Sequence, residues 1–125
     1  QVFLVLWLGA PAWFCQLTQS EKVDFDRVAK VALRIIYGEA YQGFESALKW
    51  SQIIRPTLHL AKMTEQFAKK CAKSTKFSQW FEPVPTTRSV TRTNKQQKYV
   101  QISARTGRFA NSPIPHLTQI LNREV

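Results

Sequence analysis

Apolar residues between positions 19 and 37 recur every third or fourth residue, which is the period of a helix that buries one face. Thr18 and Glu21 have the spacing of a capping box, in which each side chain accepts a hydrogen bond from the other residue's backbone N–H. We therefore expect a helix to begin near Gln19 and to end at Gly38, which suits a left-handed cap. Its expected inner stripe consists of Phe25, Val28, Ala29, Ala32 and Ile36, and the opposite side carries Arg27, Lys30 and Arg34.

Two further helices are expected downstream. The first covers about 43–50, and it ends before a break that Pro56 marks. The second covers 58–74, with Thr57 as its cap and with Lys62, Lys69 and Lys73 on its reverse side. The inner positions are Phe44, Ala47 and Leu48 in the first of these helices and Leu60, Met63, Thr64, Phe67 and Cys71 in the second. An aromatic group, Phe77, Trp80 and Phe81, is expected to close onto the helices.

The pattern changes at Pro83, where the chain becomes polar, basic and rich in threonine. Such a composition predicts a loop over 83–97, followed by a short extended segment around 100–104 and a turn at 105–108. Pro113 and Pro115 are expected to hold an extended stretch, and 116–122 is expected to form a final helical turn. The predicted fold class is mainly α, a small three-helix arrangement with an irregular basic C-terminal tail. Its parts are a helical domain at 1–82 and a largely irregular tail at 83–125.

The first 14 residues carry no charge. This run is too short for a membrane span, which needs roughly 20 apolar residues, and it lacks the positive flank of a secretory signal. We interpret it as a buried segment of a longer polypeptide, with a membrane-inserting segment as the alternative. Cys15 and Cys71 are far apart in apolar surroundings, which favours two buried free thiols and a reducing, intracellular location in the nucleus or cytoplasm.

The positive charge is concentrated in the second half of the chain. Residues 1–48 carry four basic and five acidic side chains, residues 49–82 carry seven and two, and residues 83–125 carry seven and one. With a formal net charge of +10, the chain favours a polyanionic partner, and nucleic acid is the commonest one. A solvated basic surface and a soluble linker remain the alternatives.

The inventory of catalytic groups is small. No carboxylate pair stands out, and Asp26 is expected to pair with Lys30 one turn later. Cys15, His59, Cys71 and His116 lack the short spacing of a zinc site. The four glycines form no phosphate-binding loop. We expect no active site, no metal, no cofactor and no small-molecule substrate.

Four segments in order carry a resemblance to a known family: LGAPAWFCQLTQSEKVDFDRVAKVALRIIYG at 8–38, YQGFESALKWSQI at 41–53, FAKKCAKSTKFSQWF at 67–81 and ARTGRFANSPIPHLTQILN at 104–122. Together they resemble the C-terminal region of reverse transcriptases from jockey-like, LINE-type non-LTR retrotransposons. The best-matching positions are Ala10, Pro11, Trp13, Leu17, Thr18, Arg27, Val28, Lys30, Ala32, Leu33, Arg34, Ile35 and Ile36. Leu60 and Ala61 stand where that family commonly has an arginine pair.

The resemblance implies that 1–82 corresponds to the thumb or the region just after it, and that the catalytic aspartates belong to a palm upstream of this piece. The expected role is a non-catalytic part of an RNA-directed DNA polymerase that contacts RNA or DNA mostly through phosphates, alongside the upstream domains of the parent polypeptide. The alternatives are a structural brace that packs on the polymerase and a basic protein at a membrane surface. The candidate binding residues are Arg27, Lys30, Arg34, Lys62, Lys69, Lys73, Arg88, Arg92, Lys95, Lys98, Arg105 and Arg108, with Tyr99 and Phe109 as candidates for stacking on bases.

Overall fold

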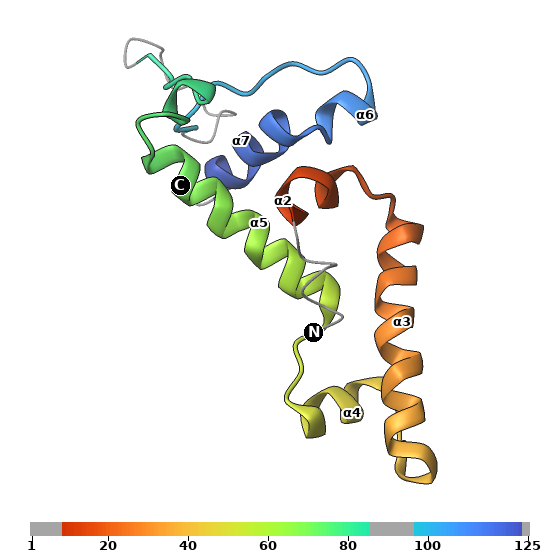
Figure 1. Cartoon of the computed structure of the whole chain (residues 1–125). Coiled ribbons are helices and arrows are strands. Elements are labelled where there is room, and N and C mark those ends of the chain that lie inside the picture. The colour runs from red at the N-terminus through yellow and green to blue at the C-terminus, as the bar shows by residue number, and fades with distance from the viewer. Residues whose placement is uncertain (1–8, 86–96, 124–125) are drawn as a thin grey trace. The chain divides into compact units, whose positions relative to one another are not determined.

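The computed structural model describes residues 9–85 and 97–123, and over these residues it confirms the mainly α-helical class (Figure 1). The three predicted helices are present as α3 (Gln19–Tyr37), α4 (Phe44–Ser51) and α5 (Pro56–Lys73). Two short helices, α2 (Ala10–Trp13) and α6 (Gly107–Ala110), and a longer one, α7 (Pro113–Arg123), complete the α-helices of the described ranges. Single 3₁₀ turns, η1 (Phe14–Gln16), η2 (Gly38–Ala40) and η3 (Ser78–Trp80), follow α2, α3 and α5.

The chain divides into two compact units. The middle unit is Leu17–Lys62, and the terminal unit combines Gln1–Gln16 with Met63–Val125. The helix α5 contributes its first residues to the middle unit and the rest to the terminal unit. This division differs from the predicted boundary between residues 82 and 83, because Phe81 on one side of that boundary shares a core with Leu117 on the other.

The middle unit is built on α3, whose start has the predicted capping box. Glu21 N donates a hydrogen bond to Thr18 Oγ1 at 3.3 Å, and Thr18 N donates to Glu21 Oε2 at 2.7 Å. At the other end of the helix, Gly38 has a φ of 50°, a region that favours glycine. Both ends of α3 are therefore where local sequence signals place them.

The buried face of α3 differs from the predicted one. Leu33 is buried with Ala47 and Leu48 of α4, whereas Val28 and Ile36, both expected inside, are 62% and 72% exposed. Because α4 has only eight residues, its apolar face covers a narrow strip of α3. Ala29 lies on this buried side as predicted. Tyr37, Tyr41 and Phe44 pack around the small core.

Asp26 joins α3 to the start of α5. Its carboxylate accepts hydrogen bonds from Thr57 N at 3.2 Å and from Thr57 Oγ1 at 2.9 Å, and Arg55 Nε lies 4.0 Å from Asp26 Oδ2. The prediction that Asp26 pairs with Lys30 is therefore wrong. Thr57 is the second residue of α5 and does not precede the helix as a cap, and Asp26 satisfies its N–H from another helix.

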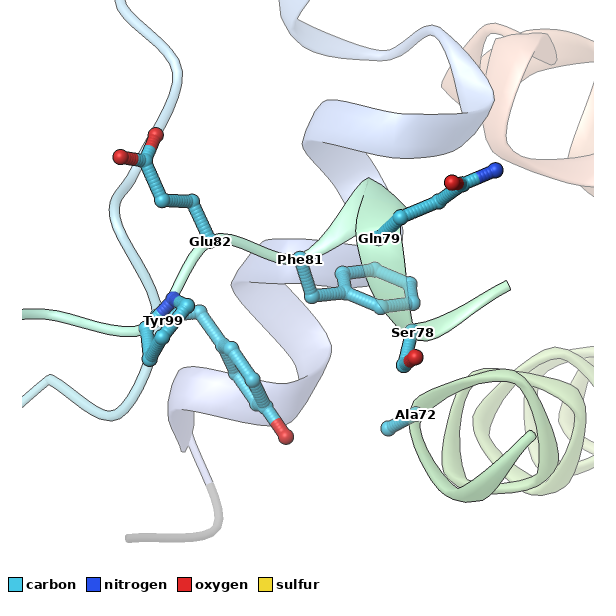
Figure 2. Close-up of a pocket in the computed structure, with 7 residues that line it drawn as sticks. Ala72, Ser78, Gln79, Phe81, Glu82 and Tyr99 are labelled. Carbon is cyan, nitrogen blue, oxygen red and sulfur yellow. The ribbon is translucent and has the colours of Figure 1, made fainter. Parts of the chain in front are cut away.

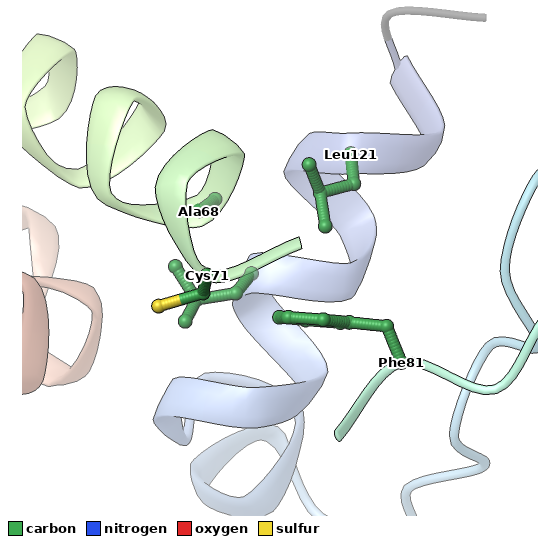
Figure 3. Close-up of a cluster of buried hydrophobic side chains, with 5 residues drawn as sticks. Ala68, Cys71, Phe81 and Leu121 are labelled. Carbon is green, nitrogen blue, oxygen red and sulfur yellow. The ribbon is translucent and has the colours of Figure 1, made fainter. Parts of the chain in front are cut away.

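The terminal unit has its own core, made by Ala68 and Cys71 of α5, Phe81 after η3, and Leu117 and Leu121 of α7. Figure 3 shows Phe81 and Leu121 directed toward the same space beside Cys71. Phe67, expected inside, is 39% exposed, and Ala68 is fully buried in its place. In the aromatic group only Phe81 is buried, since Phe77 and Trp80 are each 38% exposed.

The segment after residue 97 is more ordered than expected. Val100 N donates to Glu82 O at 2.7 Å and Val84 N donates to Lys98 O at 3.1 Å, so these two stretches pair around an isolated antiparallel bridge. The expected final helical turn is the eleven-residue helix α7. Pro113 and Pro115 stand in its first turn and form no extended stretch, because the N–H groups that proline lacks have no partner within that turn anyway.

Candidate nucleic-acid interface

Arg27, Lys30 and Arg34 form one exposed strip on α3, which we call the α3 strip. Their spacing of three and four residues puts them on one side of the helix, away from the buried Ala29 and Leu33. The distance from Arg27 to Arg34 along the helix axis is about 10 Å at about 1.5 Å per residue. That length corresponds to about three phosphates along the axis of one duplex strand.

Three carboxylates of the middle unit contact groups other than the α3 strip. Asp26 binds Thr57 and lies beside Arg55, Glu45 forms an ion pair with Arg55, and Glu21 closes the capping box of α3. In the part of the chain that the structure describes, no ion pair involves Arg27, Lys30 or Arg34. No ion pair within these residues therefore neutralises the three cations, and the exposed Asp24, three residues before Arg27, is an acidic residue close to them in sequence that has no hydrogen bond or ion pair there either.

Arg55 was not singled out by the sequence, although it contacts two carboxylates and an aromatic ring of the middle unit. It contacts Glu45 and Asp26, and its guanidinium carbon lies 5.5 Å from the centre of the Phe44 ring. These contacts give Arg55 a structural role in the middle unit. In the sequence, only Pro56, which follows Arg55, indicates that Arg55 stands just before a helix.

The lysines predicted on α5 are all exposed. Lys62 belongs to the middle unit, and Lys69 and Lys73, four residues apart, lie on one side of α5 in the terminal unit. Lys69 Nζ forms an ion pair with Glu65 Oε1 at 2.8 Å. An anion that approaches Lys69 must compete with this carboxylate, so Lys73 is the better placed of the two for a phosphate.

In the tail, the two candidates for stacking on bases, Phe109 and Tyr99, have different surroundings. Phe109 lies on α6, is 48% exposed, and stands next to the exposed Arg108. Arg105 is exposed just before Thr106, whose hydroxyl caps α6 by accepting from Phe109 N at 3.3 Å. This arrangement leaves an aromatic ring available beside cations. Arg88, Arg92 and Lys95 lie outside the described residues.

Tyr99 has a packing role. Its ring centre lies 5.7 Å from that of Phe81, and Asn122 holds its backbone at both N–H and C=O with hydrogen bonds of 3.0 Å each. The ammonium of the exposed Lys98 lies 5.5 Å from the Tyr99 ring centre. With its ring partly covered in this way, Tyr99 offers less surface for a base than Phe109 does.

A shallow pocket opens beside Tyr99, lined by Ala72, Ser78, Gln79, Phe81, Glu82, Pro83 and Tyr99 (Figure 2). The side chains of Glu82 and Gln79 extend in different directions in this view, so their polar groups do not converge on one point. Near it, Phe77 and Trp80 form an exposed aromatic pair with ring centres 4.7 Å apart. The pair is a further surface on which a base could stack. From the sequence, these two residues were expected only to pack onto the helices.

The nucleophile and metal candidates offer little chemistry. Cys15 and Cys71 are buried free thiols, and burial raises the pKa of the Cys71 thiol, which keeps it protonated and unreactive. Within residues 9–85 and 97–123, no three His, Cys, Asp or Glu side chains gather closely enough to hold a metal ion. In the same ranges no helix has both the length and the apolar character needed to cross a bilayer.

Comparison of the chain with protein-family models, with curated proteins and with solved structures finds no match.

Proposed function

We propose that this chain is a non-catalytic C-terminal piece of a retrotransposon reverse transcriptase, and that it contributes sequence-independent phosphate contacts to template RNA or to the primer duplex. The upstream domains of the parent polypeptide carry the catalytic groups. In this proposal, the binding to template or primer takes place in the nucleus or cytoplasm, where both are found. The sequence resemblance supports the parentage, and the distribution of exposed cations supports the binding role.

The observation that carries the binding role is the α3 strip. Arg27, Lys30 and Arg34 are exposed along about two turns of one helix, and no ion pair in the described residues involves any of them. The helix already fixes the backbone of these three cations, so only their side chains are ordered when they meet phosphates, and each contact releases counterions from the nucleic acid. Nothing in the strip is arranged to recognise a base, so the contacts it makes are independent of sequence.

The tail adds a second set of contacts in the terminal unit. Arg105 and Arg108 flank the helix α6, and Phe109 presents a half-exposed ring beside them. Guanidinium groups that hold phosphates, next to a ring that stacks on an unpaired base, favour single-stranded template over duplex. In this proposal the strip holds the backbone of either nucleic acid, and the tail discriminates between single strand and duplex.

The test is a salt series of binding measurements with the full chain. Fluorescence anisotropy with a labelled single-stranded RNA and a labelled duplex gives the slope of log affinity against log salt concentration. For the variant R27Q/K30Q/R34Q, the slope should fall in magnitude by about 2 on RNA and by about 3 on duplex if all three contacts are lost.

The matched control replaces three exposed lysines outside the proposed sites, K49Q/K70Q/K76Q, and removes the same net charge. This control should change the slope by less than about 1, since none of its cations contacts the nucleic acid. Equal effects from the two triple variants would show that only net charge matters. Absence of binding at low salt would refute the proposed function outright.

A further inference from the structure

A second apolar face runs along α3, separate from the face that packs on α4. Val28, Val31 and Ile35 are 62%, 50% and 76% exposed. Their spacing of three and then four residues brings them onto one stripe of the helix, which we call the α3 seam. This spacing is that of the anchors by which one helix packs against another.

The α3 seam is not needed for the core of the middle unit. That core uses Leu33 of α3, with Ala47 and Leu48 of α4, on a different side of the helix. The capping box stabilises the start of α3, and the hydrogen bond between Thr57 and Asp26 connects α3 to α5. Neither contact involves a residue of the seam. A partner helix therefore meets a surface that is already formed, and little ordering entropy is lost on binding.

The charges beside the α3 seam indicate the chemistry of its partner. Arg27 and Arg34 immediately precede Val28 and Ile35, and these are the positions that flank the apolar contact in a pair of helices. Asp24, four residues before Val28, marks the N-terminal end of the α3 seam. Carboxylates at the edges of the partner's own apolar stripe would lie opposite the two arginines.

Neither a second copy of the chain nor a nucleic acid fits the seam as well as a helix with carboxylates beside its apolar stripe does. Two antiparallel copies would bring arginines against arginines, and a parallel copy would place the uncharged Ala32 opposite Arg27. A sugar-phosphate backbone could pair with the arginines, but it has no apolar stripe to cover the two valines and the isoleucine.

We infer that the α3 seam is a docking site for an acidic amphipathic helix of another protein, with Val28, Val31 and Ile35 as the anchors and Arg27 and Arg34 as the selecting charges. This inference goes beyond the proposed nucleic-acid role. It predicts that an acidic helix and RNA compete for Arg27 and Arg34, since both use the same guanidinium groups.

The probes are two designed helical peptides of about three heptads, each with Ile and Leu at the contact positions. One carries Glu at both flanking positions of every heptad, and the other carries Lys. Calorimetry with the full chain should show roughly five- to tenfold tighter binding of the acidic peptide, as two exposed ion pairs allow. The variant R27E/R34E should reverse the preference.

A variant of the seam separates this inference from the proposed function. V31S/I35S should weaken binding of the acidic peptide at least about tenfold, because two buried anchors are lost, and it should leave RNA affinity and its salt slope unchanged. Val23→Ser is the matched control, since Val23 is 59% exposed on another side of α3. This control should bind the peptide as the parent chain does.

Several results would overturn the inference. Equal binding of the two peptides, or binding of neither, rules out selection by the arginines. A homodimer in sedimentation equilibrium that V31S/I35S dissociates would assign the seam to a second copy. A fall in the melting temperature of V31S/I35S would show that the chain itself already covers the seam.

Discussion

Replacing Asp26 by alanine should detach the start of α5 from α3. The Asp26 carboxylate accepts from Thr57 N at 3.2 Å and from Thr57 Oγ1 at 2.9 Å, and its side chain is 19% exposed. Thr57 N–H belongs to the first turn of α5, where backbone donors have no partner within the helix. Arg55, the residue before the helix, has no acceptor in its side chain, so Asp26 is the cap of α5.

The size of the effect follows from these contacts. Loss of an N-terminal cap costs about 0.5–2 kcal/mol, and a partly buried hydrogen bond to a charged acceptor contributes about 1.5–3 kcal/mol. The ion pair with Arg55, at 4.0 Å and with Arg55 36% exposed, adds less than about 1 kcal/mol. We expect Asp26→Ala to lower the free energy of unfolding by about 2 kcal/mol, and Asp26→Asn to lower it by about half of that, because one acceptor oxygen remains.

The assay combines urea denaturation, followed by circular dichroism, with amide hydrogen exchange over the first turn of α5. The control is Asp24→Ala, because Asp24 is exposed on the same helix and has no hydrogen bond within the described residues. Its effect should stay within about 0.5 kcal/mol.

A double-mutant cycle with Thr57→Val isolates the contact between the two helices. Coupling of at least about 0.5 kcal/mol between Asp26→Ala and Thr57→Val is expected for residues in direct contact. If the two effects simply add, or if exchange at the start of α5 is unchanged in Asp26→Ala, the capping role assigned to Asp26 is wrong.

Two further predictions concern the ends and the core of the fold. Thr18→Ala should destabilise α3 by about 1 kcal/mol, as loss of a cap does, measured by urea denaturation. The backbone N–H of Thr18, and after it the Thr18 hydroxyl, donate to the Glu21 carboxylate and hold its pKa below the usual 4.5, so the stability that Glu21 adds is present above that pH and is lost as the pH falls through the lowered pKa. Alanine at position 18 keeps the backbone hydrogen bond and removes that of the hydroxyl. An acid titration of helicity should therefore show a smaller loss in Thr18→Ala than in the parent chain, and an identical loss would contradict this link. Leu117→Ala should cost about 2–5 kcal/mol because Leu117 is 1% exposed in the terminal core, while Phe109→Ala, at a 48% exposed position, should stay within about 0.5 kcal/mol in the same measurement.

Local signals predicted the ends of α3 well. The spacing of Thr18 and Glu21 and the glycine at position 38 act through neighbouring backbone groups, so no knowledge of distant residues is needed to locate the helix. The exposed α3 strip followed from helical periodicity in the same way. In the tail, the extended stretch predicted from Pro113 and Pro115 was wrong. The effect of proline on a helix depends on whether it stands in the first turn or in the interior, and both prolines stand in the first turn of α7.

The buried side of α3 could not be predicted from periodicity. Apolar residues surround much of the helix, so Val28 and Ile36 fitted a stripe as well as Leu33 did, and only the position of the short helix α4 decided which residues are covered. The same limitation hid the cap of α5, since Asp26 and Thr57 are 31 residues apart in sequence. It also hid the packing role of Tyr99, which depends on Asn122 and Phe81.

The sequence by itself determined that the segments of α3, α4 and α5 are helical, where α3 begins and ends, and where the positive charge is concentrated, because these depend on side chains within a few residues of one another. Only the tertiary structure decided which apolar residues are buried, which carboxylates are already engaged, and that an apolar seam on α3 stays exposed. Burial and pairing depend on which segments meet in space, and contacts between residues far apart in the chain leave no periodic trace in a single sequence.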